Sequence, residues 1–359
     1  MLFNSSRFRV ARKRRRVSKT RLAEIVGVHA RAITAFESGE YAPAPETAER
    51  LAQALNFQTD FFFGEDLCEP SVATASFRSL ARMTASTREA ALAKGAMAIH
   101  FHDWMERRFG LPVCDLPDLR EEDPETAAIA LRHEWGLGEK PVRNMVHLLE
   151  SKGVRVFSMV ETLDIDAFSF WRDVTPFIFL NTTKSAEHRR FDAAHELGHL
   201  VLHRKVGVHG KEAEHEANRF ASSFLMPRGS VLAHAPVLPN LQVLIDLKSH
   251  WIVSLGALVY RLHALGVIGK WHYHKLWMEI SERGYRTKEP KGASPEMSLI
   301  LGKVFQILRS EGVTRADVAR ALSYNPEDLD EVIFGLVVTG LQGGGQTSGK
   351  AESVIHLVK

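Results

Sequence analysis

The His-Glu-Leu-Gly-His run at residues 195–199 constrains this chain more than any other feature of its sequence. Two histidines four residues apart, His195 and His199, lie on one face of an α-helix and can bind the same metal ion. The flanking residues are largely apolar and contain no proline, which predicts a helix over about residues 186–203. Glu196 is then placed to act as a base on a water molecule bound to the metal. The run therefore predicts a zinc-dependent hydrolytic site.

A third metal ligand has to support this prediction, because a run this short also arises by chance on a surface helix. A catalytic zinc ion takes three protein ligands and one water molecule. The next predicted helix, residues 211–225, offers the carboxylates of Glu212, Glu214 and Glu216. At about 100° per residue, Glu214 falls nearest to the apolar stripe of this helix, and Glu216 is the alternative on the other side. The sequence favours Glu214 as the third zinc ligand.

Other polar residues near the run have weaker assignments. Asn218 follows Glu214 by four residues, and we expect its amide oxygen to accept a hydrogen bond from a zinc-bound imidazole. His203 continues the spacing of the two histidines and is interpreted as a helix-end residue or as a partner of a ligand. His209 and Tyr260 are candidates for stabilising a negatively charged oxygen, although a structural role is the stronger interpretation of each. Substrate backbone is expected to pair with the predicted strand at 176–181 or with its neighbour.

The first 64 residues predict a small all-helical unit. Nine basic residues and no acidic residue lie between Arg7 and Arg21, although the formal net charge of the chain is only +3. Two short helices joined at Gly27, within a four-helix pattern, have the layout of a helix-turn-helix. The alternative is a helical bundle with a solvated basic face, but such a concentration of like charge is destabilising unless an anion binds it. We therefore expect double-stranded DNA, in an operator, as a partner.

The third predicted helix, residues 29–37, would enter the major groove. His29, Arg31 and Thr34 are predicted to face the bases. Arg31 is the best base reader, because a guanidinium can donate two hydrogen bonds to guanine, and a phosphate contact is the alternative for it. The other predicted phosphate contacts form a basic cluster of Arg12, Arg14, Arg15, Arg16 and Lys19.

The remaining chain divides by pattern into four regions. These are a helical connector (65–123), an α+β unit (124–230), a mostly helical region (231–340) and a flexible tail (341–359). Cys68 and Cys114 do not make a disulfide framework. No signal peptide or membrane-spanning segment is recognisable, so we expect a cytoplasmic protein without a membrane partner.

Several motifs resemble known families. In the α+β unit they are Trp135-Gly136-Leu137, Leu149-Glu150 with Gly153-Val154, Leu180-Asn181, Arg190-Phe191 before Ala194-His195-Glu196-Leu197-Gly198-His199-Leu200, and Glu216-Ala217-Asn218-Arg219-Phe220-Ala221 before Leu225-Met226-Pro227. This set resembles the ImmA/IrrE-type metallopeptidases. In the N-terminal unit they are Leu22-Ala23, Gly27-Val28, Ile33 and Phe36-Glu37-Ser38-Gly39, which resemble an XRE-type helix-turn-helix. Phe77-Arg78-Ser79 and the segment 248–262 resemble the long members that fuse both parts.

The resemblance implies a multidomain fold and a function. The fold is an all-α helix-turn-helix domain, then an α+β zincin-like metallopeptidase domain, then a mostly helical C-terminal region. The implied site is Zn²⁺ on His195, His199 and Glu214, with Glu196 as the base. The implied substrate is a helix-turn-helix repressor, whose cleavage releases stress-response or mobile-element genes. Regulators of this layout often form homodimers.

Three functions remain open on the sequence. The first is an active zinc endopeptidase that its DNA-binding domain directs to operators or repressors. The second is a non-proteolytic transcriptional regulator, or an antitoxin-like protein, whose metal site is structural or sensory. The third is a scaffold with a degenerate site. The intact run disfavours the third, because a decaying site is expected to lose Glu196 first.

Overall fold

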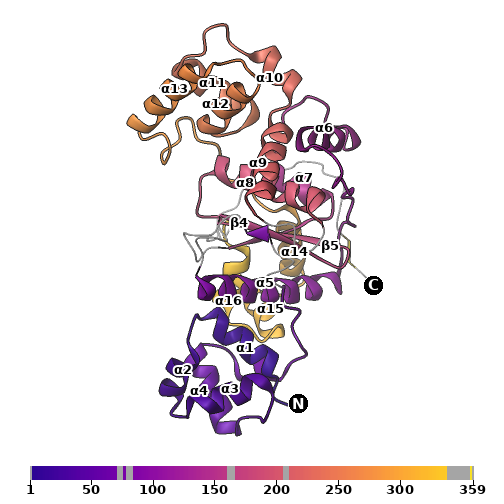
Figure 1. The fold of residues 1–359 in the computed structure, drawn as a ribbon. Coiled ribbons are helices and arrows are strands. Elements are labelled where there is room, and N and C mark those ends of the chain that lie inside the picture. Colours follow the sequence, from indigo (N-terminus) through magenta and orange to yellow (C-terminus); the bar gives the residue numbers. More distant parts are fainter. Residues whose placement is uncertain are drawn as a thin grey trace.

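The computed structural model describes residues 2–70, 76–77, 84–159, 166–204, 210–337 and 356–357. Figure 1 shows an elongated molecule with the N-terminal helices at one end and a small sheet in the middle. The helices at the opposite end are α10 (Arg228–His234), α11 (Leu241–Trp251), α12 (Leu255–Ala264) and α13 (Lys270–Glu282). The predicted multidomain order, with helices before and after an α+β unit, is confirmed.

The N-terminal unit is built from short helices around one apolar core. They are α1 (Ser5–Arg14), α2 (Lys19–Val26), α3 (Ala30–Ser38), α4 (Pro45–Leu55) and the 3₁₀ helix η1 (Thr59–Phe63). Helix α2 begins where the Ser18 hydroxyl accepts from the Arg21 N–H, and it ends at Gly27, whose φ of +73° favours glycine. Leu22 and Ile33 are fully buried between α2 and α3. This packing fixes the angle of the helix-turn-helix.

Helix α5 (Ala85–Glu106) separates the N-terminal unit from the sheet. It is buried over most of its length, as expected for a helix that is covered on several sides. The connector is not helical throughout, because the two-residue strands β1 (Ser76–Phe77) and β2 (Phe109–Gly110) also lie in it. Part of the Phe77-Arg78-Ser79 motif and most of the predicted flexible tail lie outside the described residues, but β6 (His356–Leu357) pairs with β2.

The sheet has the order β1-β4-β5-β3. Strand β5 (Thr175–Leu180) is antiparallel to β4 (Ala167–Arg172) and parallel to β3 (Arg155–Ser158). Because β5 has a neighbour on each side, it cannot add a substrate strand, which rules out the first of the two expected strands. The outer edge of β4 pairs with β1 at Phe168 and Ser169.

Two helices on this sheet carry the metal-site residues. Helix α8 (Ala186–Leu202) packs on β4 and β5, and α9 (Lys211–Leu225) packs across α8. Their close approach requires Gly198, because a Cβ there would lie 3.0 Å from the Phe220 ring. The glycine of the opening run is therefore a packing residue. Helices α6 (Pro124–Glu134) and α7 (Met145–Ser151) also pack against this pair of helices.

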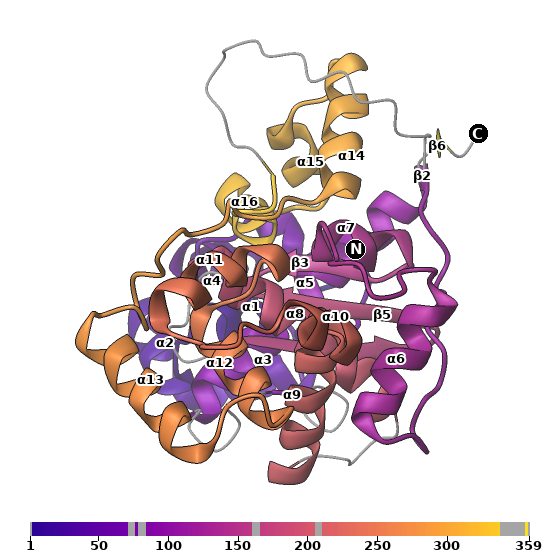
Figure 2. The ribbon, with the colours of Figure 1, turned by 90° about the horizontal axis from the view of Figure 1, so that it is seen from above.

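The last helices of the chain contact elements from its N-terminal unit. Figure 2 shows α14 (Leu299–Ser310), α15 (Arg315–Ala321) and α16 (Pro326–Ile333) on the side of the sheet away from α13. Helix α16 contacts β3, and its acidic residues pair with α1. The C-terminal region therefore connects the sheet with the N-terminal unit.

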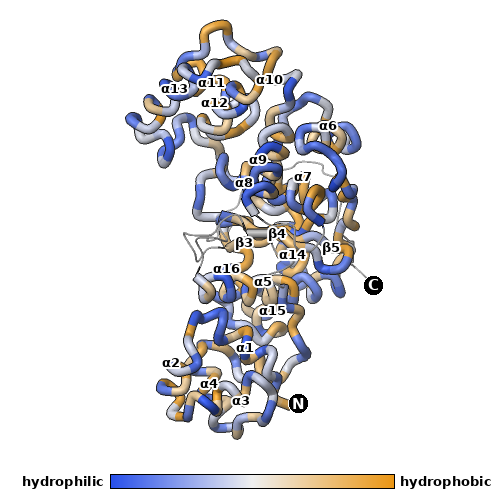
Figure 3. Tube along the Cα trace, viewed as in Figure 1, coloured by the Kyte–Doolittle hydropathy of each residue, from blue (hydrophilic) through white to orange (hydrophobic). Residues whose placement is uncertain are grey.

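The opposite end of the molecule exposes apolar residues. Figure 3 shows hydrophobic colour on the connection between α10 and α11, where Val237 and Leu238 are exposed. Among the described residues no single helix is both long and apolar enough to cross a membrane. The pair α11 and α12, bent by 96°, meets the length and composition only when both helices are counted together.

Candidate metal centre

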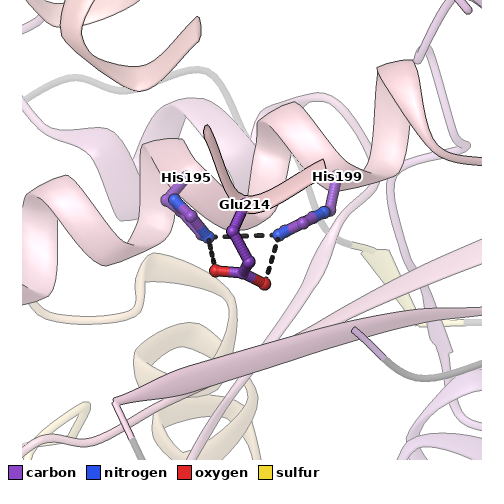
Figure 4. A group of neighbouring side chains, drawn as sticks. All are labelled: His195, His199 and Glu214. Carbon is purple, nitrogen blue, oxygen red and sulfur yellow. Dashed lines mark hydrogen bonds and ion pairs between the residues drawn. The ribbon is translucent and has the colours of Figure 1, made fainter. Parts of the chain in front are cut away.

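Helices α8 and α9 bring three donor groups to one point. His195 and His199 project from consecutive turns of α8, and Glu214 of α9 reaches between them (Figure 4). The two Nε2 atoms are 3.1 Å apart. The Glu214 carboxylate places one oxygen 3.4 Å from the His195 Nε2 and the other 3.4 Å from the His199 Nε2. The two histidines therefore lie beside Glu214, the carboxylate that the sequence favours as the third ligand.

The spacing of these donor atoms suits a tetrahedral metal ion. Metal–ligand bonds of about 2.0–2.2 Å at tetrahedral angles put neighbouring donors about 3.3–3.6 Å apart, close to the separations found here. Both imidazoles are buried, and the Glu214 side chain is 26% exposed. Burial raises the pKa of the Glu214 carboxyl, but the two neighbouring histidines outweigh this effect and lower the pKa to about 2. An ionised carboxylate beside two imidazoles is a donor set for a divalent metal.

A hydrogen-bonded chain fixes the tautomer of His199. Glu216 accepts from the His203 Nε2 at 2.8 Å, and the Nδ1 atoms of His203 and His199 are 2.9 Å apart. Burial lowers the pKa of His203, against the raising effect of Glu216, so we assign a neutral ring. A neutral His203 that donates through Nε2 accepts through Nδ1, so His199 must donate from its own Nδ1. The lone pair of His199 Nε2 then points toward Glu214 and His195.

Asn218 does not have the role expected from the sequence. Its side-chain amide donates to the backbone carbonyl of Glu214 at 2.7 Å. Sharing a helical face with Glu214 places it near the ligand, but the bond is made to the backbone of its own helix. The pair formed by His203 and Glu216 occupies the position predicted for Asn218, as a partner of a ligand imidazole.

Strand β4 orients Glu196. This carboxylate is fully buried, and its Oε2 accepts from the Ser169 hydroxyl at 2.6 Å. The same hydroxyl lies 3.4 Å from the backbone carbonyl oxygen of Glu196. No sequence pattern points to Ser169, because it lies 27 residues before Glu196 and only the packing of α8 on β4 joins them.

A cavity of about 370 Å³ is lined in part by the two helices that carry the metal group. Its walls come from α8, α9 and the helices α12 and α13, and its lining comprises His188, Phe191, Asp192, His215, Asn218, Ser254, Ala257, Tyr260 and Trp277. Tyr260, a candidate for stabilising a negatively charged oxygen, is therefore at the cavity. The other candidate, His209, lies outside the described residues.

A second group on α5 has metal-binding residue types. His102, Asp103 and Glu106 also place three possible donor atoms close together. Asp103, however, pairs with Arg172 at 2.5 Å. Burial, together with nearby Arg155 and Arg172, lowers the pKa of His102 to about 3. We assign this group to packing between α5 and the sheet, because the Asp103 carboxylate already has a cationic partner in Arg172.

The predicted base-reading residues lie on one exposed helix. His29 precedes α3 as its cap residue, and Arg31 and Thr34 lie on the outer side of the helix. Ile33 and Phe36 are buried on the inner side. The face of α3 opposite the core is thus available to a DNA groove.

The basic cluster is largely engaged within the chain, which corrects its assignment to phosphate. Arg12 and Lys19 both bind Glu37, at 2.5 and 2.9 Å. Arg14 is buried and pairs with Glu331, and Arg15 donates twice to Asp328. Arg16 donates to the Thr87 hydroxyl. The acidic partners of Arg14 and Arg15 lie in α16, more than 300 residues later, so the positive charge is unbalanced only in the local sequence.

Two regions of the chain match known protein families. Residues 8–62 match a helix-turn-helix model, and residues 149–263 match the Peptidase M78 model, described as the IrrE N-terminal-like domain. The chain is therefore an N-terminal helix-turn-helix domain fused to an IrrE-like domain, which confirms the resemblance read from the motifs. The second match runs from α7 into α12 and contains the whole metal group. A search of curated proteins finds no match.

Proposed function

We propose that this chain is a DNA-binding transcriptional regulator with a zinc-dependent endopeptidase site that cleaves a helix-turn-helix repressor. The observation that carries the proposal is the convergence of His195, His199 and Glu214 beside the buried carboxylate of Glu196. Two histidines and one carboxylate are a ligand set of zinc peptidases, which leave a fourth position open. The repressor as substrate is carried over from the family resemblance.

The three ligands would hold Zn²⁺, which supplies a Lewis acid that polarises the peptide carbonyl and lowers the pKa of a bound water molecule. The Glu214 carboxylate brings one negative charge to the cation. The chain from Glu216 through His203 keeps the His199 Nε2 unprotonated and directed at the metal position. These residues bind and orient, and they take no part in proton transfer to the substrate.

Glu196 is the acid and base of the proposed reaction. Its carboxylate takes a proton from water as the water oxygen bonds to the peptide carbonyl carbon. It returns that proton to the amide nitrogen as the carbon–nitrogen bond breaks, so the products are a carboxylate and an amine. The Ser169 hydroxyl, bound to Oε2, holds the carboxylate in one orientation during both transfers. Burial of Glu196 keeps bulk water away from this proton.

The second candidate is a regulator that does not cleave protein. It is favoured by the ion pairs of Arg14 and Arg15 with α16, which couple the DNA-binding unit to a helix that contacts β3 of the domain carrying the metal site. A metal ion that tightens α8 and α9 could then act on DNA binding without any hydrolysis. This candidate and the first share the same metal ligands.

The test compares the zinc-loaded wild type with Glu196→Gln, using helix-turn-helix repressors encoded beside the gene for this chain as substrates. Cleavage by the wild type alone supports the peptidase. Zinc binding and operator binding by both proteins, without cleavage of any repressor, favours the regulator. Metal analysis of Glu214→Ala and Glu216→Ala separates the two carboxylates. Full zinc content in Glu214→Ala, with loss in Glu216→Ala, would show that the ligand assignment is wrong.

A further inference from the structure

We infer that the cavity lined by α8, α9, α12 and α13 binds a large, uncharged aromatic side chain of a peptide substrate. The inference rests on the proposed function and adds a substrate preference that neither family model assigns. The cavity holds about 370 Å³, which falls within the range of small-ligand sites. Such sites hold molecules larger than any single side chain, so the size of the cavity admits even the largest residues.

The cavity lies on the helical faces that carry the metal ligands. On α8, Asp192 lines it and precedes His195 by three residues, which is about 4.5 Å along the helix. On α9, Asn218 lines it and follows Glu214 by four residues, which is about 6 Å. Neighbouring residues of an extended peptide are about 3.3 Å apart. A side chain one or two positions from the peptide bond at the proposed metal position can therefore reach the cavity.

The lining offers no free counter-ion to a charged side chain. Among the described residues that line the cavity, Asp192 is the one carboxylate, and no lysine, arginine or glutamate occurs. The Asp192 side chain is 2% exposed and pairs with Lys184, whose Nζ lies 3.9 Å from its Oδ2. A charged side chain that entered the cavity would lose hydration without gaining an ion partner, whereas an uncharged side chain avoids this cost.

Rings line the cavity from several sides. Five of its nine lining residues carry a ring, and these five come from four different helices. They include Phe191 of α8, Tyr260 of α12 and Trp277 of α13. Aromatic rings in edge-to-face or offset contact bind one another more tightly than their buried area alone accounts for. An aromatic side chain gains this extra attraction in the cavity, and an aliphatic side chain of the same size does not.

The aromatic wall is fixed at one side and exposed at another. Trp277 packs directly on α12, where a Cβ added at Gly256 would lie 2.8 Å from its Cη2 atom. Tyr260 is 37% exposed, and His188 and His215 are exposed as well. A peptide side chain can therefore enter past the exposed rings and pack against one that is already held in place.

The adjoining cavity suits an uncharged ring less well. It holds about 210 Å³ and shares Trp277 with the first cavity. Two charged side chains, Arg286 and Glu289, line it, and Glu289 also pairs with Lys248 at 3.4 Å. These charged groups make the smaller cavity the more polar of the two, so we assign the aromatic side chain to the larger one.

Peptide binding by the Glu196→Gln protein, with zinc present, tests the inference without requiring cleavage. The probes are fluorescent heptapeptides of one sequence whose central residue is phenylalanine, its saturated analogue cyclohexylalanine, alanine, lysine or glutamate. We expect the phenylalanine peptide to bind about 10- to 100-fold more tightly than the alanine peptide, the range for burying a large apolar side chain. It should bind about 2- to 10-fold more tightly than the cyclohexylalanine peptide, the range for contacts between rings.

The lysine and glutamate peptides should bind no more tightly than the alanine peptide. Four results overturn the inference. They are equal affinities for phenylalanine and alanine, equal affinities for phenylalanine and cyclohexylalanine, tighter binding of the lysine peptide than of the phenylalanine peptide, and no binding of the phenylalanine peptide at millimolar concentration.

Paired substitutions on α13 separate the cavity from the rest of the surface. Trp277→Leu removes a ring from the wall and should abolish the preference for phenylalanine over cyclohexylalanine. Trp271→Leu is the matched control, because this tryptophan is 76% exposed and does not line the cavity, and it should leave the preference unchanged. Equal effects of the two substitutions would count against the cavity.

A third variant keeps the test decisive if Trp277→Leu does not fold, which circular dichroism checks. Ala257→Phe fills the cavity from α12, away from the metal ligands. It should abolish the preference for phenylalanine over alanine while zinc content stays at the wild-type level. An unchanged preference in Ala257→Phe overturns the inference.

The outcomes also distinguish this inference from the proposed peptidase. Phenylalanine preference without cleavage of any repressor by the wild type supports the cavity assignment and counts against the peptidase. Cleavage by the wild type without phenylalanine preference supports the peptidase and overturns the cavity assignment.

Discussion

Arg15, the residue that caps the end of α1, donates two hydrogen bonds of 2.7 Å to the carboxylate of Asp328 in α16. The Asp328 side chain is 1% exposed, and Arg14 approaches the same carboxylate at 3.9 Å. Residues that are 313 positions apart thus form one buried ion cluster. The DNA-binding unit is thereby attached to the helix that also contacts β3 of the metal domain.

Asp328→Ala should lower the free energy of unfolding by about 3–5 kcal/mol. The substitution removes the buried carboxylate that the guanidinium groups of Arg14 and Arg15 face. Urea denaturation measures the change. The matched control is Asp246→Ala, whose partner Lys291 is exposed, and it should cost less than about 1 kcal/mol. Equal effects of the two substitutions would contradict a structural role for the cluster.

Arg31→Ala should weaken operator binding by about 1–3 kcal/mol, the worth of a paired contact to guanine. Titration of labelled operator and of unrelated DNA at several salt concentrations measures it. The loss should be confined to the operator. A similar loss on both DNAs, with a shallower salt dependence, would instead identify Arg31 as a phosphate contact. Arg320→Ala, at an exposed residue of α15, is the control and should leave both affinities unchanged.

The sequence predicts well what local patterns control. Helix α2 has the residue bounds expected from its Ser18 cap and Gly27, and the two histidines of the opening run share a face because their spacing is helical. Glu214 was favoured over Glu216 from the angle between each residue and the apolar stripe of α9. Glu214 lies near the two histidines in the structure because α9 buries this apolar stripe against α8, the helix that carries them.

What the sequence could not predict depends on how distant elements cross. Because α9 crosses α8, Glu216 contacts His203, whereas Asn218 donates to a backbone carbonyl of its own helix. Both residues lie near Glu214 in sequence. The packing of β4 brings Ser169 to Glu196. Helical periodicity describes one helix at a time and carries no information about these contacts.

His203→Ala should lower zinc affinity about 10- to 100-fold while the protein stays folded, because His199 loses the group that fixes its tautomer. Competition with a zinc chelator measures the affinity, and circular dichroism checks the fold. Asn218→Ala is the matched control on the neighbouring helix and should retain wild-type affinity. A larger loss in Asn218→Ala than in His203→Ala would restore the role that the sequence suggested for Asn218.

Glu150 should make the stability of the protein fall as the pH rises from about 5 to 8. This buried residue of α7 accepts from the backbone N–H groups of Leu299 and Ile300 at the start of α14. Burial dominates over these hydrogen bonds and raises its pKa from 4.5 to about 7. Because the folded pKa is the higher one, the folded state binds the proton more tightly than the unfolded state does. Its contribution is complete below the unfolded pKa and is lost as the pH rises through about 7.

The shift of Glu150 corresponds to about 3 kcal/mol of unfolding free energy. Glu150→Gln keeps the shape of the protonated side chain but cannot ionise. The variant should therefore resemble the wild type at pH 5 and become more stable than the wild type by pH 8. Urea unfolding at four pH values between 5 and 8 measures the difference. Glu311→Gln, at an exposed glutamate just after α14, should leave the pH profile as it is. If the wild type and Glu150→Gln keep a constant difference across this range, Glu150 is ionised throughout, and the hydrogen bonds from α14 outweigh the cost of its burial.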